Sequence, residues 1–306
     1  MAEHRLRLSD GASILLRRTG NPKGPRLLVS HGTGFAIDGF ARMWRPLAGN
    51  HDLIVFDLRG HGHSGAVSPE TVDGPRLTLD MAEVLAAVAE VWGERPVFGL
   101  FHSISALMAL RLEAQAPGSF SGLVLIEPPA SPPKESPGFE AFEQGRLGLE
   151  ARSAKRQTHF SSIEELAAKF TGRGPFRHFE PGSAQELAAS MLVPDGDGWR
   201  LACPPEVEAR YFGRNLDDGL GERLKQVACP VLMLVGRDDL AIAGTPACIA
   251  VDLARLGGFD ILELANATHM LPLERPGAIA VFARAFVKRH HQGTQVVGTD
   301  PRSMSR

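Results

Sequence analysis

The chain has little net charge, few cysteines and no long apolar run. Its 33 Lys+Arg nearly balance 35 Asp+Glu, so we expect no surface that attracts nucleic acid or an anionic membrane. The three cysteines, Cys203, Cys229 and Cys248, are odd in number and lack CxxC or CxxH spacing, which argues against a disulfide framework or a zinc site.

No segment approaches the roughly 18 apolar residues of a membrane span, and "MAEHRLRLSDGASILLRR" lacks the charged start and apolar core of a signal peptide. These absences predict a cytoplasmic protein that binds neither nucleic acid nor a membrane. A small-molecule substrate is the expected partner, and the sequence leaves a homodimer open.

A chain of 306 residues, 43% of them hydrophobic, can bury a large core. Short β-branched or leucine-rich runs alternate with amphipathic segments, which indicates an α/β fold with a mostly parallel central sheet flanked by helices. The predicted strands are Arg26 to Gly32, Asp52 to Gly60, Pro96 to Phe101, Gly122 to Pro129, Pro230 to Asp239 and Phe259 to His269. The predicted helices are Leu79 to Val91, Ile104 to Gln115, Pro246 to Leu256 and Pro276 to His290.

The alternation is interrupted once, between residues 130 and 224. This segment has no recognisable buried strand but contains "SSIEELAAKF", in which Ser162 and Glu165 are spaced as a helix capping box. We therefore predict a core formed by residues 1–129 and 225–290, with a mainly helical lid at 130–224. The aperiodic residues 291–306 are predicted to be a flexible tail.

Polar residues follow the predicted strands, at the sheet edge where parallel sheets place reactive groups. One of these sites is "VFGLFHSISALMAL", residues 97–110, where Ser103 lies between a strand and a helix. A serine at such a sharp turn exposes its hydroxyl, and the amide after it faces a developing oxyanion. The alternative is that Ser103 has a structural role alone, as the N-cap residue of the helix.

The usual form of this turn is G-x-S-x-G, but here Phe101 and Ser105 replace the two glycines. Taking Ser105 as the nucleophile would place it inside the helix and put Leu107 at the crowded position, so Ser103 is favoured. Phe101 then requires either space beside the strand or a distorted turn.

A serine nucleophile needs an imidazole to take its proton and a carboxylate to orient the imidazole. Asp239 ends one predicted strand, and His269 follows the last, which gives the chain order Ser, Asp, His. Either residue alone is more often a turn or surface residue. Because Ser103, Asp239 and His269 stand at three strand ends of one predicted sheet, they favour a catalytic triad.

The sequence resembles the α/β-hydrolase fold superfamily, in particular its lid-bearing serine hydrolase branch. The matching segments are "HGTGF" (31–35), "DLRGHGHS" (57–64), "HSISA" (102–106), "GRDD" (236–239) and "THMLPLERP" (268–276). The resemblance covers about Arg26 to Lys288 and implies a lid inserted after the sixth strand of the fold.

The resemblance also implies roles for individual residues. Ser103 would be the nucleophile, His269 the general base and acid, and Asp239 the carboxylate that orients the imidazole. The amides of Thr33 and Ile104 would form the oxyanion hole. Glu127 is a rival acid, because some members carry the acid at the end of the strand after the nucleophile turn.

The expected function is a cofactor-free serine hydrolase that cleaves an ester, lactone or thioester of a small apolar molecule. One alternative is a C–C bond hydrolase using the same triad. The other is a weakly active ligand receptor, which the altered turn at Phe101 and Ser105 motivates. No metal is implied, because His61 and His63 lie in a tight glycine turn without supporting ligands, and the glycine-rich segments lack nucleotide-binding spacing.

Overall fold

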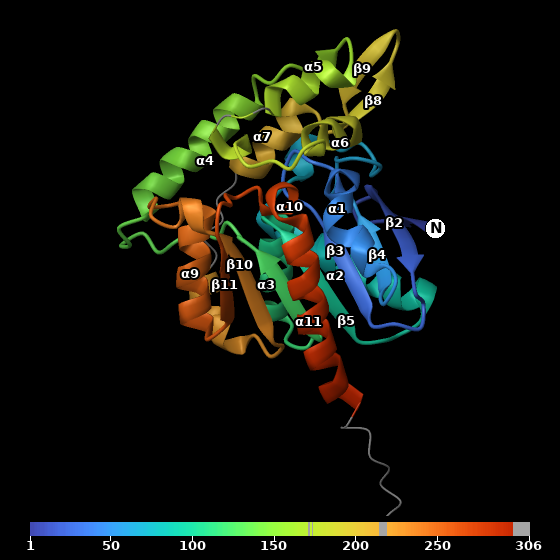
Figure 1. Ribbon diagram of the computed structural model, residues 1–306, viewed down its shortest axis with the longest axis vertical. Coiled ribbons are helices and arrows are strands. Elements are labelled where there is room, and N and C mark those ends of the chain that lie inside the picture. Colours follow the sequence, from blue (N-terminus) through green and yellow to red (C-terminus); the bar gives the residue numbers. More distant parts are fainter. Residues whose placement is uncertain (171, 173, 214–218, 296–306) are drawn as a thin grey trace, which may run out of the picture.

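An eight-stranded sheet forms the core of the computed structural model, which describes residues 1–170, 172, 174–213 and 219–295 (Figure 1). The strands follow the order β1 (Ala2–Arg7), β2 (Ser13–Gly20), β4 (Asp52–Phe56), β3 (Arg26–Ser30), β5 (Val97–His102), β6 (Gly122–Ile126), β10 (Val231–Gly236) and β11 (Asp260–Leu264). The pairs β1–β2 and β2–β4 are antiparallel, and all other neighbours are parallel. The predicted α/β fold with a mostly parallel sheet is confirmed.

All six predicted strands are present, and each begins within one residue of its expected start. Five of them end earlier than predicted, because the polar residues at their carboxyl ends already belong to loops or, after β10, to the 3-10 helix Arg237–Asp239. The hairpin of β1 and β2 was not predicted. Its alternation of buried and exposed side chains fits an antiparallel edge with one solvated face.

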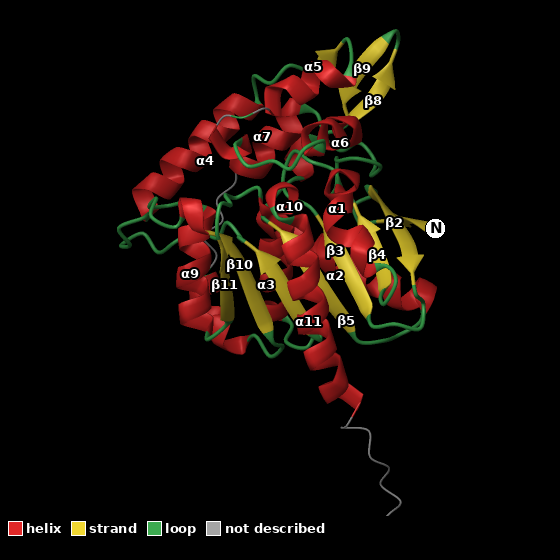
Figure 2. Ribbon diagram, viewed as in Figure 1, coloured by secondary structure: helices red, strands yellow, loops and turns green. Residues whose placement is uncertain are grey.

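Helices cover both faces of the sheet (Figure 2). One face packs against α2 (Gly74–Trp92), α3 (Ile104–Gln115) and α9 (Pro246–Gly257), and the other against α1 (Ala41–Trp44), α10 (Leu271–Glu274) and α11 (Pro276–Gln295). Because both faces are covered, every residue of β3, β4 and β6 is buried.

Two predicted helices are longer than expected. Helix α2 begins at Gly74 because Asp73 caps it, accepting a hydrogen bond from the Arg76 amide. Helix α11 continues to Gln295 and so includes the first residues of the predicted tail. Residues 296–306 of that tail lie outside the described residues.

Residues 130–224, which we call the lid segment, separate β6 from β10, and most of the segment lies over one end of the sheet (Figure 1). The segment is mostly helical, with α4 (Phe139–Ser153), α5 (Ile163–Ala167), α6 (Ser183–Met191), α7 (Pro205–Gly213) and α8 (Leu220–Arg223). It also contains a small antiparallel sheet that was not predicted, in the order β7 (His159–Phe160), β9 (Gly198–Leu201) and β8 (Leu192–Asp195). These strands are short and partly exposed, so they lack the apolar run that marks a core strand.

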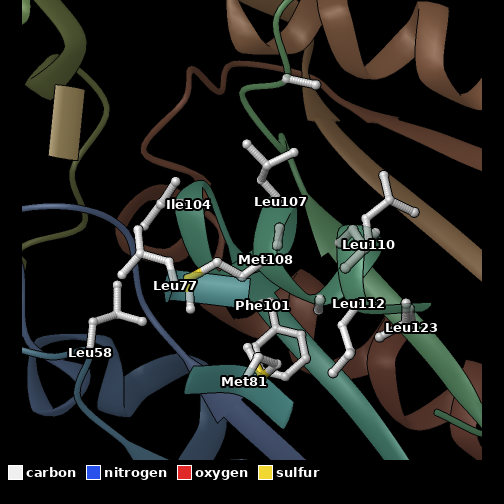
Figure 3. Close-up of a cluster of buried hydrophobic side chains, with 14 of the residues drawn as sticks. Leu58, Leu77, Met81, Phe101, Ile104, Leu107, Met108, Leu110, Leu112 and Leu123 are labelled. Carbon is white, nitrogen blue, oxygen red and sulfur yellow. The ribbon is translucent and has the colours of Figure 1, made fainter. Parts of the chain in front are cut away.

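Phe101 fits into the core without distorting β5. Its ring is fully buried on the face covered by α2 and α3, near Met81 and Leu112 (Figure 3). It also meets Phe120 edge to face, with ring centroids 5.8 Å apart. Space for the ring exists because residue 99 is glycine, where a Cβ would overlap the Phe101 ring.

We expect Gly99→Ala to lower the free energy of unfolding by about 1–3 kcal/mol, because the added methyl group overpacks the core against Phe101. Denaturant unfolding measures the change. Gly277→Ala in α11 is the matched control, because a Cβ there meets nothing within 4 Å. Equal stability of the two variants would show that Phe101 does not depend on Gly99.

Candidate active site

Ser103 lies in a strained turn between β5 and α3. Its backbone has φ 56° and ψ −121°, a conformation that a residue with a side chain rarely adopts. The Ser103 amide donates to the Ile126 carbonyl at 2.8 Å. The Ser105 hydroxyl accepts from the His102 amide at 3.1 Å and donates to the His102 carbonyl at 2.9 Å. Ser105 thus closes the turn at the position where glycine is usual.

The Ser103 side chain makes no capping hydrogen bond to α3. Instead, its Oγ lies 3.1 Å from Nε2 of His269. The helix-cap interpretation of Ser103 therefore fails, and the hydroxyl is left to interact with the imidazole.

Glu127 is the carboxylate that contacts the imidazole. Its Oε2 lies 2.7 Å from Nδ1 of His269, and its Oε1 accepts from the Gly236 amide at 2.7 Å. The side chain is completely buried. A carboxylate at Nδ1 places the proton on that nitrogen, which leaves Nε2 as an acceptor facing Ser103.

The structure does not place Asp239 where the sequence pattern led us to expect it. Asp239 Oδ2 accepts from the backbone amide of His269 at 3.2 Å, and Glu127 takes the position at Nδ1. Asp239 ends a short 3-10 helix, Arg237–Asp239, while Glu127 directly follows β6 with a φ of 46°. The turned backbone and the longer side chain of Glu127 bring its carboxylate to the ring.

The loop "HGTG" after β3 faces the start of α3. Thr33 and Ile104 both line the cavity that contains Ser103. Among the described residues, no hydrogen-bond acceptor is found for either amide, as is usual for the first amides of a helix such as Ile104. The two amides are therefore available to an oxygen bound beside Ser103.

Side chains of the motif "DLRGHGHS" hold this loop in place through hydrogen bonds. The Gly34 amide donates to His61 Nε2 at 2.9 Å, and the Ile37 amide donates to Asp57 Oδ1 at 2.7 Å. The His63 amide donates to the other oxygen of Asp57 at 2.9 Å. His61 and Asp57 thus hold backbone amides, which accounts for the motif without a metal.

His102 is a buried neighbour of the site for which the sequence analysis assigned no role. Its Nε2 donates to the His269 carbonyl at 2.9 Å, and the two rings have centroids 4.8 Å apart. Its Nδ1 finds no hydrogen-bond partner among the described residues. Burial is the main reason, and the neighbouring His269 a second one, that the pKa of His102 lies well below its ordinary value. The ring therefore stays neutral. In the sequence, the only feature that points to His102 as a site residue is its position directly before Ser103.

A cavity of about 730 Å³ opens onto Ser103 and His269, within the size range of small-molecule sites. Its walls are mostly apolar, and five lid-segment phenylalanines line it, Phe142, Phe160, Phe170, Phe176 and Phe212. Within the described part of the chain, no cluster of three or more His, Cys, Asp or Glu side chains is placed to hold a metal ion.

The sequence profile of the Alpha/beta hydrolase family matches residues 27–281. The chain belongs to this family. Lipase LipV of Mycobacterium tuberculosis is 26% identical to this hydrolase over 279 residues, which cover 86% of this chain and 94% of that protein. Human monoglyceride lipase is 35% identical over 125 residues, 39% of this chain and 41% of that protein.

Solved structures share the fold of this hydrolase along nearly its whole length. E-2-(acetamidomethylene)succinate hydrolase superposes with a TM-score of 0.75 at 22% identity, covering 94% of this chain and 99% of that one. Esterase RhEst1 from Rhodococcus sp. ECU1013 gives a TM-score of 0.69 at 25% identity, covering 94% of this chain and 99% of that one. No helix in the described ranges of this hydrolase is both long and apolar enough to cross a bilayer.

The buried, neutral His102 predicts a pH-dependent stability of this hydrolase. Its native pKa is lowered from 6.5, so below pH 6.5 the unfolded chain binds a proton that the native ring does not, and stability falls as the pH falls. Between pH 7 and pH 5 this ring alone removes at most about 2 kcal/mol of unfolding free energy, the limit for a ring that stays neutral throughout.

We expect His102→Gln, whose amide can still donate to the His269 carbonyl, to lose less stability than wild type over that interval, by up to about 2 kcal/mol. Denaturant unfolding at both pH values measures the difference, with His4→Gln on the edge strand β1 as control. A wild-type slope in His102→Gln would mean that the native His102 ring takes up its proton over the same pH range as in the unfolded chain.

Proposed function

We propose that this chain is a cofactor-free serine hydrolase that cleaves an ester, lactone or thioester bond of a small, largely apolar molecule. The observation that carries the proposal is the line of hydrogen bonds from Glu127 through His269 to Ser103 at the base of an apolar cavity. The relatives named lipases and the neighbour named an esterase support an ester-type bond.

In the proposed reaction, Ser103 Oγ attacks the substrate carbonyl while His269 Nε2 takes the hydroxyl proton. The negative oxygen of the tetrahedral intermediate accepts hydrogen bonds from the Ile104 and Thr33 amides. His269 then gives the proton to the leaving alcohol or thiol, and an acyl-enzyme remains on Ser103.

Water completes the cycle. His269 takes a proton from the water as it attacks the acyl-enzyme, and then returns a proton to Ser103 Oγ as the carboxylic acid leaves. Glu127 accepts the hydrogen bond from His269 Nδ1 in both halves. It fixes the tautomer of His269 and stabilises the imidazolium that forms in each step.

The strained backbone of Ser103 and its 3.1 Å contact with His269 favour turnover over the receptor alternative. Phe101 no longer motivates that alternative, because Gly99 accommodates its ring. C–C bond hydrolysis would use the same residues, so a panel of ketonic substrates beside the esters distinguishes the two reactions.

Ser103→Ala tests the nucleophile. We expect it to lower kcat/KM on p-nitrophenyl esters by at least about a thousandfold, and to abolish labelling by a serine-directed phosphonate. Ser119→Ala, in the turn after α3, is the control and should behave as wild type. A folded wild type that neither hydrolyses any ester nor accepts the phosphonate would refute the esterase proposal.

Paired substitutions of the two carboxylates identify the acid. Glu127→Gln is expected to lower kcat by about 10³–10⁴-fold, because an amide at Nδ1 favours the wrong imidazole tautomer. Asp239→Asn should cost tenfold or less, at most about 1.4 kcal/mol, because the hydrogen bond of Asp239 is to the His269 backbone and the ring nitrogen is bound by Glu127. The reverse order of the two effects would assign the acid to Asp239.

A further inference from the structure

Positive charge is concentrated on the lid-segment side of the cavity above Ser103. Four cationic side chains line it: Arg146, Arg152, Arg156 and Lys169. Among the described lining residues, Glu208 is the only carboxylate. All four belong to the lid segment, so the cations lie in the part of the cavity lining that this segment supplies.

Two of the four cations have no carboxylate partner. Within the described part of the chain, no carboxylate lies at ion-pair distance from Arg152 or Lys169, and Lys169 Nζ donates to Gln157 Oε1 at 2.8 Å. Arg146 differs, because it binds both oxygens of Glu143 and donates to the Phe212 carbonyl. Lys169 is close enough to Glu165 for a charge interaction, but neither Arg152 nor Lys169 is tied into an ion pair, so both can still contact an anion.

Arg156 is held close to the "HGTG" loop after β3. Its Nη1 donates to Glu208 Oε2 at 2.7 Å, and Glu208, which is 7% exposed, also accepts from Ser153 Oγ at 3.1 Å. A Cβ on Gly34 would lie 2.7 Å from Glu208 Oε1, so this ion pair packs against the loop that carries Thr33. The hydrogen bond to Glu208 uses one of the five N–H groups of the guanidinium.

We propose that the substrate carries a carboxylate separate from the bond that is cleaved, and that Arg156 binds it with support from Arg152 and Lys169. The planar guanidinium matches a carboxylate with two parallel hydrogen bonds. The phenylalanines of the cavity then enclose the apolar chain between the carboxylate and the ester. This proposal rests on the proposed function and names its substrate class, the half-esters of dicarboxylic acids and related anionic esters.

The test compares three p-nitrophenyl esters of equal chain length: the monoester of suberic acid, its terminal amide and the octanoate. The acid and the amide are nearly equal in size, so their difference reports charge. We expect wild type to favour the acid over the amide by about tenfold in kcat/KM at low ionic strength. The preference should decline toward parity at about 0.5 M salt, because partly exposed charges are screened.

Single substitutions identify the residues that bind the carboxylate. We expect Arg152→Gln, Lys169→Gln and Arg156→Gln each to lower the acid-to-amide ratio several-fold, and Arg156→Lys to retain part of it. Arg156→Gln also leaves the buried Glu208 without its partner, so Arg152→Gln and Lys169→Gln keep the test valid if that variant fails to fold. Arg255→Gln is the control, because this exposed arginine pairs with Asp252 outside the cavity.

The outcomes distinguish the inference of a bound carboxylate from the proposal of a serine hydrolase. Hydrolysis of the octanoate and the amide without a preference for the acid would overturn this inference and leave the serine hydrolase intact. A preference that none of the three sites affects would also overturn it. A folded protein inactive on all three esters and unlabelled at Ser103 would refute the proposed function itself.

Discussion

The hydrogen bond between Glu127 and Nδ1 of His269 is the constraint on which the geometry of the site depends. It joins the end of β6 to the loop after β11, and the second oxygen of Glu127 binds the Gly236 amide at the end of β10, the strand between them. A completely buried carboxylate is costly unless both oxygens are engaged. Glu127 meets this condition by fixing the relative positions of three strand ends.

Much of the fold could be predicted from the sequence because buried parallel strands produce apolar runs that differ clearly from amphipathic helices. The same pattern indicated Ser103, which follows such a run, whereas His269 follows β11, whose residues are mostly exposed, and was indicated by its place after the last predicted strand. The partner of Nδ1 could not be decided in this way. Asp239 and Glu127 both follow buried strands, and the difference between them is the direction of a side chain after a turned backbone, which depends on φ at one residue. Short, half-exposed strands such as those of the lid segment carry no comparable signal.

The turn at Ser103 shows how tertiary packing can replace a local sequence rule. Glycine is usual two residues before the nucleophile because the turn is crowded, yet this chain has Phe101 there. The crowding is relieved two residues earlier, where Gly99 leaves room for the ring on the α2 and α3 face of the sheet. Ser105 replaces the second glycine and ties the turn with two hydrogen bonds to His102. A search for the local motif alone would pass over this chain.

The placement of Glu127 directly after β6 has a consequence for how the site assembles during folding. Ser103, the Ile104 amide and Glu127 all belong to one strand–helix–strand unit, β5–α3–β6, whose parts are close in sequence and pair directly. Contacts of this kind form early and at low entropic cost. The Gly236 amide that binds Glu127 and the imidazole of His269 both come from beyond the lid segment. The line of hydrogen bonds is therefore complete only when β10 and β11 have joined the sheet beside β6.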